Sequence, residues 1–281
     1  MKKSKMSGVV LLFLTGAILL LPTFTIFTSS FMGYPELVQS YGCVLGNGEG
    51  NLEWKIFPLY PTLRAYVELL LDSPGFFVMF WNSCRHVFLI LAGQIIVGTP
   101  AAWAFARYDF FGKRLFFLLY MILMILPFQV TMTSSYLVLS RFNLIDTVYA
   151  VVLPGVFSTF PVFIMTKFFR GIPKSLIEAA KADGAGEFYI FFHIGLPLGK
   201  PGIFSALILS FLEYWNAIEV PMTFLKSEEK YPLSLYLPEI TTDRISVSFA
   251  ASVIMILPAL LLFLFGQEYL EQGIAASGLK E

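Results

Sequence analysis

The polar residues best spaced for a specific task lie in a semi-polar segment between two long apolar runs. Ser175 and Glu178 stand three positions apart, the spacing of a capping box in which the serine begins a helix and the glutamate closes back on it. Gly184 follows where such a helix would end, and glycine suits the left-handed conformation of a helix C-terminus. We therefore expect a short helix over residues 176–183 that ends in a glycine turn.

A second short helix is expected over residues 187–194, where Pro197 and Pro201 would close it. Two short helices joined by a glycine turn can lie along a membrane surface and present one face to a soluble partner. Such an element is stiff enough to transmit a rigid-body movement and small enough to fit a cleft. Taken singly, a cap, a helix-ending glycine and two helix-favouring alanines also have a purely structural interpretation.

A second group of polar residues interrupts an apolar stretch nearer the C-terminus: Glu213, Asn216 and Glu219, with Trp215 among them. On one continuous helix, residues three positions apart lie about 60° apart around the axis, which would centre a polar stripe on Asn216. Polar groups inside a membrane span mark a transport pathway by default, and Gln94 and Gln129 are further candidates. Hydrogen bonding between helices, or a place at a subunit interface, is an equally open interpretation of this stripe.

Residues suited to ATP or metal binding are not grouped anywhere along the chain. It contains no Gly-x-x-x-x-Gly-Lys-Ser/Thr segment, so it has no loop that would hold ATP phosphates. His86 and His193 each lack a second ligand at metal spacing, and Cys43 and Cys84 form neither a metal-binding pair nor a redox motif. We expect no catalytic residue, metal or cofactor in this chain, and an energy source in separate subunits.

The composition indicates a chain built for lipid. Of 281 residues, 57% are hydrophobic and 14% are charged, with a mean hydropathy of +0.75, whereas soluble domains carry about 25% charged residues. The zero net charge gives no support for nucleic-acid binding. A spanning helix needs about 20 apolar residues, and six runs qualify, the last one interrupted only by two glutamates: 6–35, 86–106, 115–140, 147–166, 245–267 and 202–224. These runs are too long for barrel strands, so an all-α fold with six transmembrane helices is expected.

Charges in the connecting segments predict the orientation. With the N-terminus inside, twelve Lys and Arg residues fall in cytoplasmic segments and seven in external ones, which is the positive-inside bias. Both termini and the segment around Glu178 are then cytoplasmic, and residues 32–78 form an external loop with a short amphipathic helix over 63–71. A cleaved signal peptide is the alternative interpretation of the N-terminus, but no small-x-small cleavage site follows the first apolar run.

Several motifs together resemble the permease subunits of ABC importers, specifically the carbohydrate type. Glu178-Ala179-Ala180, then Gly184 after three residues and Ile194 after nine more, followed by Leu196-Pro197, resemble the EAA loop that docks onto a cytoplasmic ATPase. Further matching segments are spread over nearly the whole chain: Asn82-Ser83, Arg107, Asn143 to Thr147, Trp215-Asn216 and Gly273 to Lys280. Ser134-Ser135 depart from the pattern, because relatives often carry a proline before Tyr136.

The resemblance implies a type I ABC importer permease fold. It implies a first transmembrane helix and external loop over residues 1–77, a core transmembrane domain over 78–268 with the coupling loop at 171–200, and a cytoplasmic tail over 269–281. The positions that match those inserting into the ATPase are Glu178, Ala179, Ala180, Asp183 and Gly184. The stripe residues Glu213, Trp215, Asn216 and Glu219 are the candidates for the substrate pathway.

The implied function is transport of a sugar or oligosaccharide across the cytoplasmic membrane of a prokaryote by alternating access. The implied partners are a second homologous permease, two ATPases that bind ATP and magnesium, an extracytoplasmic solute-binding protein and membrane lipid. Import of a polyol, glycerol phosphate or another small solute is the alternative. A membrane-embedded transferase would need an acid-base set that the chain lacks, and a secondary transporter would show inverted repeats, which are not visible.

Overall fold

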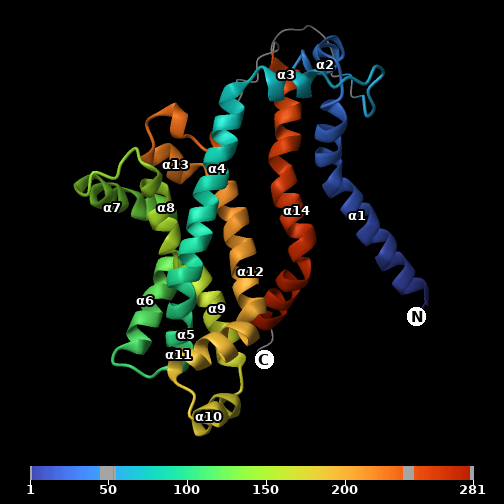
Figure 1. Cartoon of the computed structure of the whole chain (residues 1–281). Coiled ribbons are helices and arrows are strands. Elements are labelled where there is room, and N and C mark those ends of the chain that lie inside the picture. The colour runs from blue at the N-terminus through green and yellow to red at the C-terminus, as the bar shows by residue number, and fades with distance from the viewer. Residues whose placement is uncertain (1, 45–52, 54, 237–243, 279–281) are drawn as a thin grey trace. The chain divides into compact units, whose positions relative to one another are not determined.

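The computed structural model describes residues 2–44, 53, 55–236 and 244–278, and every regular element in these ranges is helical (Figure 1). The chain divides into two compact units, one of Met1–Phe77 with Tyr236–Pro258 (unit 1) and one of Val78–Leu235 with Ala259–Glu281 (unit 2). The α-helices are α1 (Lys2–Ser29), α2 (Tyr34–Tyr41), α3 (Arg64–Leu71), α4 (Pro74–Gly93), α5 (Thr99–Arg107), α6 (Lys113–Ile125), α7 (Phe128–Arg141), α8 (Val148–Val156), α9 (Thr159–Gly171), α10 (Lys174–Ala182), α11 (Glu187–Ile190), α12 (Leu196–Trp215), α13 (Glu219–Phe224) and α14 (Ile245–Gly278). Short π-helical turns occupy Gln94–Gly98 and Phe191–Gly195, and 3-10 turns occupy Glu228–Lys230 and Leu233–Leu235.

Among the described residues, five helical segments are long and apolar enough to cross a membrane, or six if one bent pair counts as a span. The five are Gly8–Ser29, Pro74–Arg107, Val148–Gly171, Glu187–Trp215 and Ile245–Glu271. The all-α prediction with its candidate spans is therefore confirmed.

The run over residues 115–140 was expected as one helix, and this is wrong. It forms α6 and α7, which meet at an angle of 108°. Pro127 has no N–H to continue α6, and its ring pushes the preceding residue away from helical geometry. Leu126 is accordingly extended, with φ −67° and ψ 125°.

The proline-closed helix over 187–194 is also wrong, because α11, the π-helical turn Phe191–Gly195 and α12 follow one another without a break. Pro197 lies in the first turn of α12 and Pro201 lies inside it. A π-helical turn shifts the hydrogen-bond pattern by one residue. A proline just after such a turn therefore removes little backbone hydrogen bonding. The same order recurs where Gln94–Gly98 precedes Pro100.

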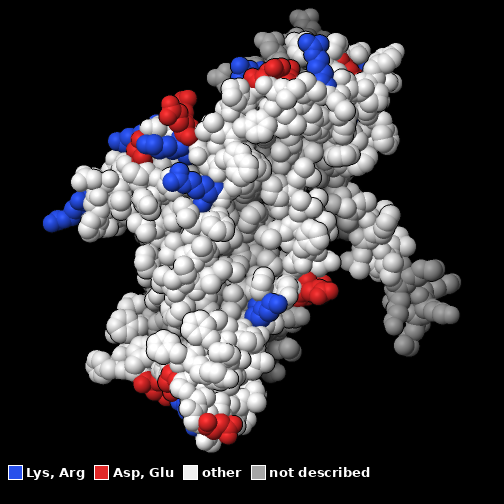
Figure 2. All heavy atoms as spheres, viewed as in Figure 1, with Lys and Arg blue, Asp and Glu red and all other residues white. Residues whose placement is uncertain are grey.

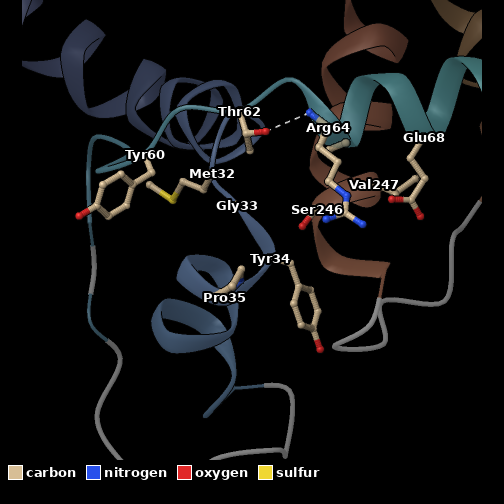
Figure 3. Close-up of a pocket in the computed structure, with 11 residues that line it drawn as sticks. Met32, Gly33, Tyr34, Pro35, Tyr60, Thr62, Arg64, Glu68, Ser246 and Val247 are labelled. Carbon is tan, nitrogen blue, oxygen red and sulfur yellow. Dashed lines mark hydrogen bonds between the residues drawn. The ribbon is translucent and has the colours of Figure 1, made fainter.

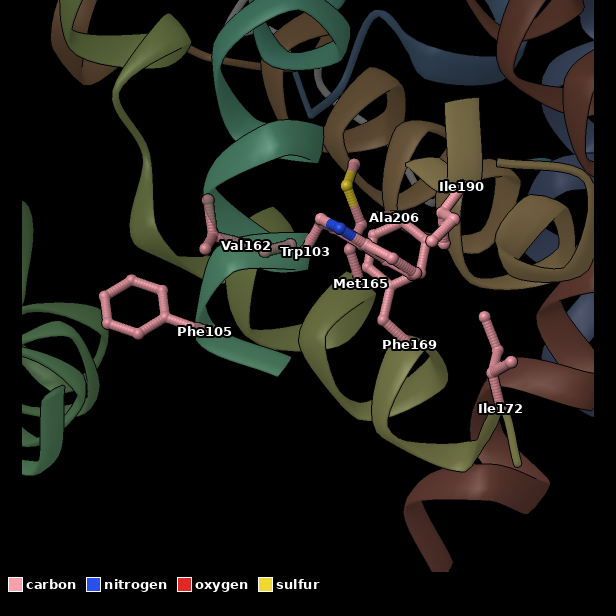
Figure 4. Close-up of a cluster of buried hydrophobic side chains, with 9 residues drawn as sticks. Trp103, Phe105, Val162, Met165, Phe169, Ile172, Ile190 and Ala206 are labelled. Atoms are coloured by element: carbon pink, nitrogen blue, oxygen red, sulfur yellow. The ribbon is translucent and has the colours of Figure 1, made fainter. Parts of the chain in front are cut away.

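The core of unit 2 lies between α5, α9 and α12. The Trp103 ring packs edge-on against Phe169, with ring centroids 5.3 Å apart, and Met165 and Ile190 lie around it (Figure 4). Helices α9 and α12 approach closely because α12 presents glycine to aromatic rings. A Cβ on Gly199 would collide with the ring of Phe169, the small-residue contact usual between membrane helices.

Charged side chains of unit 2 gather toward its ends. On the face in Figure 2, they cluster over α13 and again around α10, and few lie on the surface between. This distribution fits a membrane-embedded surface with polar ends.

The turn joining α7 to α8 is held by one carboxylate. Asp146 Oδ1 accepts hydrogen bonds from the amides of Lys226 (2.9 Å) and Ser227 (3.0 Å). Its Oδ2 accepts from Ser227 Oγ at 2.6 Å and from Lys230 Nζ at 2.8 Å. These bonds hold the pKa of Asp146 well below its usual range, with the Lys230 contact the largest cause. The segment after α13 is thereby tied to the α7–α8 turn.

In unit 1, the buried side chains Met32, Leu37 and Ile245 form a small core that joins the turn after α1 to α2 and α14. The expected amphipathic helix over 63–71 is present as α3, and its Tyr66 hydroxyl lies 2.7 Å from Ser30 Oγ. The turn-rich residues 46–51 and the end of the expected C-terminal tail lie outside the described residues.

Candidate functional site: helix α10 and its attachment

Helix α10 begins two residues earlier than the capping box requires. Pro173 occupies the N-cap position, with φ −58° and ψ 135°, and no side chain caps the helix. Ser175 therefore lies inside the first turn, and its predicted role as the cap is wrong. Proline sets this boundary because its fixed φ suits a helix start and its missing N–H costs nothing there.

The C-terminal end of α10 has the predicted glycine geometry. Gly184 has φ +86°, its N–H donates to Lys181 O, and Ala185 N–H donates to Ala180 O at 2.9 Å. This is the Schellman pattern, which satisfies the last carbonyls of a helix. An added Cβ on Gly184 would meet no atom within 4 Å, so the backbone conformation alone favours glycine.

The two faces of α10 differ sharply. Ile177 and Ala180 turn inward and pack against the core of unit 2. Glu178, Ala179 and Asp183 are exposed, as is Gly184. Four of the five predicted coupling residues thus share the outer surface, while Ala180 serves as the inner contact. Helix α10 is therefore packed against the core on one face and exposed on the other.

Arg107 attaches this element to the core. The guanidinium at the end of α5 donates from Nη2 to Phe169 O, and to Ile172 O at 2.6 Å. Phe169 lies in the last turn of α9 and Ile172 is its C-cap residue, where carbonyls have few backbone partners; Phe169 O also accepts the Ile172 N–H at 3.3 Å. The same guanidinium lies over the Trp103 ring, 5.4 Å from its centroid. One charged side chain therefore ties α5 to the end of α9, next to the start of α10.

A second attachment joins the two helices of the loop. Lys181 Nζ lies 2.5 Å from Glu187 Oε1, and Tyr108 OH donates to Glu187 Oε2 at 2.9 Å. Burial and the neighbouring Glu187 raise the pKa of Tyr108, and Glu187 also raises the pKa of Lys181. Both groups therefore keep their protons at neutral pH, and the chain from Tyr108 to Lys181 bridges the glycine turn. No local sequence pattern predicts the contact between Glu187 and Tyr108, because the two residues lie 79 positions apart.

The predicted polar stripe near the C-terminus does not form on one helix. Helix α12 ends at Trp215, Asn216 is its C-cap and donates to Leu212 O at 2.8 Å, and Glu219 begins the separate helix α13. Trp215 is buried and its ring stacks on Phe211 at 5.5 Å. The 60° spacing argument for Asn216 is therefore wrong, since it assumed an unbroken helix.

Of the two further pathway candidates, Gln94 is buried and donates to Gly155 O at 2.9 Å, whereas Gln129 makes a contact that the sequence did not predict. Gln129 Nε2 on α7 donates to Glu219 Oε1 on α13 at 2.6 Å. Two polar side chains from different apolar segments thus meet, and both are exposed. Within the described part of the chain, no three His, Cys, Asp or Glu residues gather to hold a metal ion.

Comparisons with known proteins agree with this arrangement. Residues 94–276, nearly two thirds of the chain, match the model of the binding-protein-dependent transport system inner membrane component family. The arabinooligosaccharides transport system permease protein AraQ of Halalkalibacterium halodurans is 31% identical over 222 residues, covering 78% of this chain and 80% of that protein. The galactooligosaccharides transport system permease protein GanQ of Bacillus subtilis is 27% identical, covering 90% and 92%.

A solved structure shares the fold. A bacterial ABC transporter involved in the import of the acidic polysaccharide alginate has a chain that superposes with a TM-score of 0.79 at 23% identity, covering 95% of this chain and 96% of that one. Taken with the sequence matches, the helical spans and the exposed helix α10, this establishes the assignment. The chain belongs to the family of binding-protein-dependent transport system inner membrane components.

Proposed function

We propose that this chain is one permease subunit of an ATP-driven importer that carries a sugar or oligosaccharide across the cytoplasmic membrane. Helix α10 is the observation that carries the proposal: its outer face is open while Arg107 fixes the adjoining end of α9 to the core. The relatives named for arabinooligosaccharide and galactooligosaccharide transport support a saccharide substrate.

In this proposal the partners supply what the chain lacks. Two ATPase subunits bind ATP with magnesium and hydrolyse it, a second permease completes the membrane path, and an external binding protein delivers the solute. Glu178, Ala179, Asp183 and Gly184 meet the ATPase, with Ala180 seated behind them. Both termini and α10 face the cytoplasm. The Gln129–Glu219 contact and Asn216 line the path, where their polar groups meet hydroxyls of the solute.

Uptake by proteoliposomes tests the proposal. The assembled transporter should accumulate labelled arabinotriose or galactotriose only with ATP on the ATPase side. Glu178→Arg should weaken ATPase binding at least about tenfold, as expected for a central interface residue. Glu228→Arg makes the same charge reversal on an exposed turn far along the chain and should leave binding unchanged. Uptake without ATP, or equal effects of the two reversals, would contradict the proposal.

A further inference from the structure

A hollow of about 680 Å³ opens within unit 1. Three helix starts line it: Tyr34 and Pro35 of α2, Arg64 and Glu68 of α3, and Ser246 of α14 (Figure 3). Small-molecule sites in proteins typically enclose about 300–1,000 Å³ and combine rings with a few converging polar groups. The size and the lining of this hollow both match that description.

Two opposite charges face the hollow without neutralising each other. Arg64 and Glu68 lie one turn apart on α3, yet neither side chain has an ion pair or a hydrogen bond to any described residue. Ser246 Oγ is buried and also has no hydrogen-bond partner there. A guanidinium offers only donors and a carboxylate only acceptors, while a hydroxyl offers both. Arg64 and Glu68 are both exposed, so the hollow presents unpaired donors and unpaired acceptors together.

Aromatic surface completes the lining. Tyr60 is 82% exposed and Tyr34 is 44% exposed, and Figure 3 shows Tyr60 on one side of the hollow with Arg64 and Glu68 on the other. A tyrosine ring gives a flat apolar face with a hydrogen-bonding edge. Such rings are usually covered by a ligand or partner when they gather at a concave surface.

The charges select the class of ligand. Arg64 and Glu68 carry opposite charges, so the hollow favours no net charge on its ligand, and an apolar molecule would displace water from both side chains without replacing the lost hydrogen bonds, which is costly. A neutral molecule with many hydroxyl groups and apolar ring faces satisfies all of them. We propose that unit 1 carries a saccharide-binding site in this hollow, at the end of the candidate span that begins at Ile245. The inference rests on the proposed function, which places the hollow on the side from which the solute arrives.

Saturation-transfer NMR tests the site directly. The wild-type transporter in nanodiscs, with its partner subunits but without the binding protein, is mixed with arabinotriose or galactotriose. We expect saturation of the sugar ring protons. The double variant Arg64→Ala with Glu68→Ala should weaken binding at least about tenfold, because two charge-assisted hydrogen bonds are lost. Tyr60→Ser removes a ring that is too exposed to affect folding, and it should also weaken binding.

Val67→Ala is the matched control, since Val67 is an exposed residue of α3 that does not line the hollow. It should bind both sugars as the wild type does. Absence of saturation in the wild type, or equal binding by the wild type, the double variant and Tyr60→Ser, would overturn the site. Uptake by proteoliposomes is measured in parallel and decides the proposed function alone, so the two failures are distinguishable.

Discussion

Replacing Gly184 with valine tests the backbone conformation at the C-terminus of α10 separately from any side-chain contact. The residue has φ +86°, and a new Cβ would have no atom within 4 Å. The penalty therefore comes from the backbone alone. An L-residue in the left-handed helical region costs roughly 1–2 kcal/mol, and a β-branched residue at positive φ is a stronger outlier.

That penalty destabilises the two hydrogen bonds that close the C-terminus of α10, from the N–H groups of Gly184 and Ala185. A loss of about 1–2 kcal/mol lowers the ratio of the closed to the opened helix end by a factor of about 5–30. If the ATPase recognises the closed form, its affinity for the permease should fall by the same factor. The measurement is ATPase binding to nanodisc-embedded permease by biolayer interferometry, with membrane insertion checked by gel filtration.

Gly184→Asn is the control, because asparagine tolerates positive φ far better than valine. We expect it to bind ATPase nearly as the glycine form does. An equal loss in the asparagine and valine variants would mean that any side chain at this position blocks the partner. Wild-type binding by the valine variant would refute the argument from backbone geometry altogether.

Three other predictions concern the attachment, the α7–α8 turn and the orientation. Arg107→Gln should lower the melting temperature and the sugar moved per ATP, because each charge-assisted hydrogen bond contributes about 1.5–3 kcal/mol; Arg107→Lys should recover part of both, and wild-type values in the glutamine variant would count against this role. The pKa of Asp146 is lowered chiefly by Lys230, so its stabilisation is present at neutral pH and is lost as pH falls below about 4. Asp146→Asn should therefore melt earlier at pH 7 and lose the acid-dependent part of the melting curve, and an unchanged acid dependence would contradict this. With Cys84 replaced, Cys43 should react with an impermeant thiol reagent in intact right-side-out cells, whereas labelling only after lysis would reverse the orientation.

Long apolar runs and local glycine chemistry were predictable from the sequence. The runs fix which segments are helical, because a bilayer admits no unpaired backbone, and the positive φ of Gly184 follows from the type of residue at a helix end. The bend at Leu126–Pro127 was also encoded, since a proline restricts the residue before it. The end of α12 at Trp215 was not, because no glycine or proline follows it within four residues.

Competing local signals explain the error at Ser175. The pair Ser175 and Glu178 satisfies the capping-box spacing, but Pro173 satisfies a second rule for helix starts two residues earlier. The structure follows the proline, because its ring fixes φ covalently whereas a side-chain cap must be ordered at an entropic cost. Where both signals occur within one turn, the proline sets the helix start.

The attachment of Arg107 to the end of α9 could not be predicted from any local sequence pattern. Helix α9 ends just before Pro173, where carbonyls such as Phe169 O and Ile172 O have few backbone partners, although Phe169 O accepts the Ile172 N–H. Some donor must satisfy them, but the sequence does not say which, and Arg107 lies more than sixty positions away. Pro173 and Gly184 therefore mark the two ends of α10, the proposed coupling element. Its attachment to the core depends on Arg107. Mutations in the two classes should accordingly differ: changes at Gly184 should act on ATPase affinity, and changes at Arg107 on how much transport each bound ATPase drives.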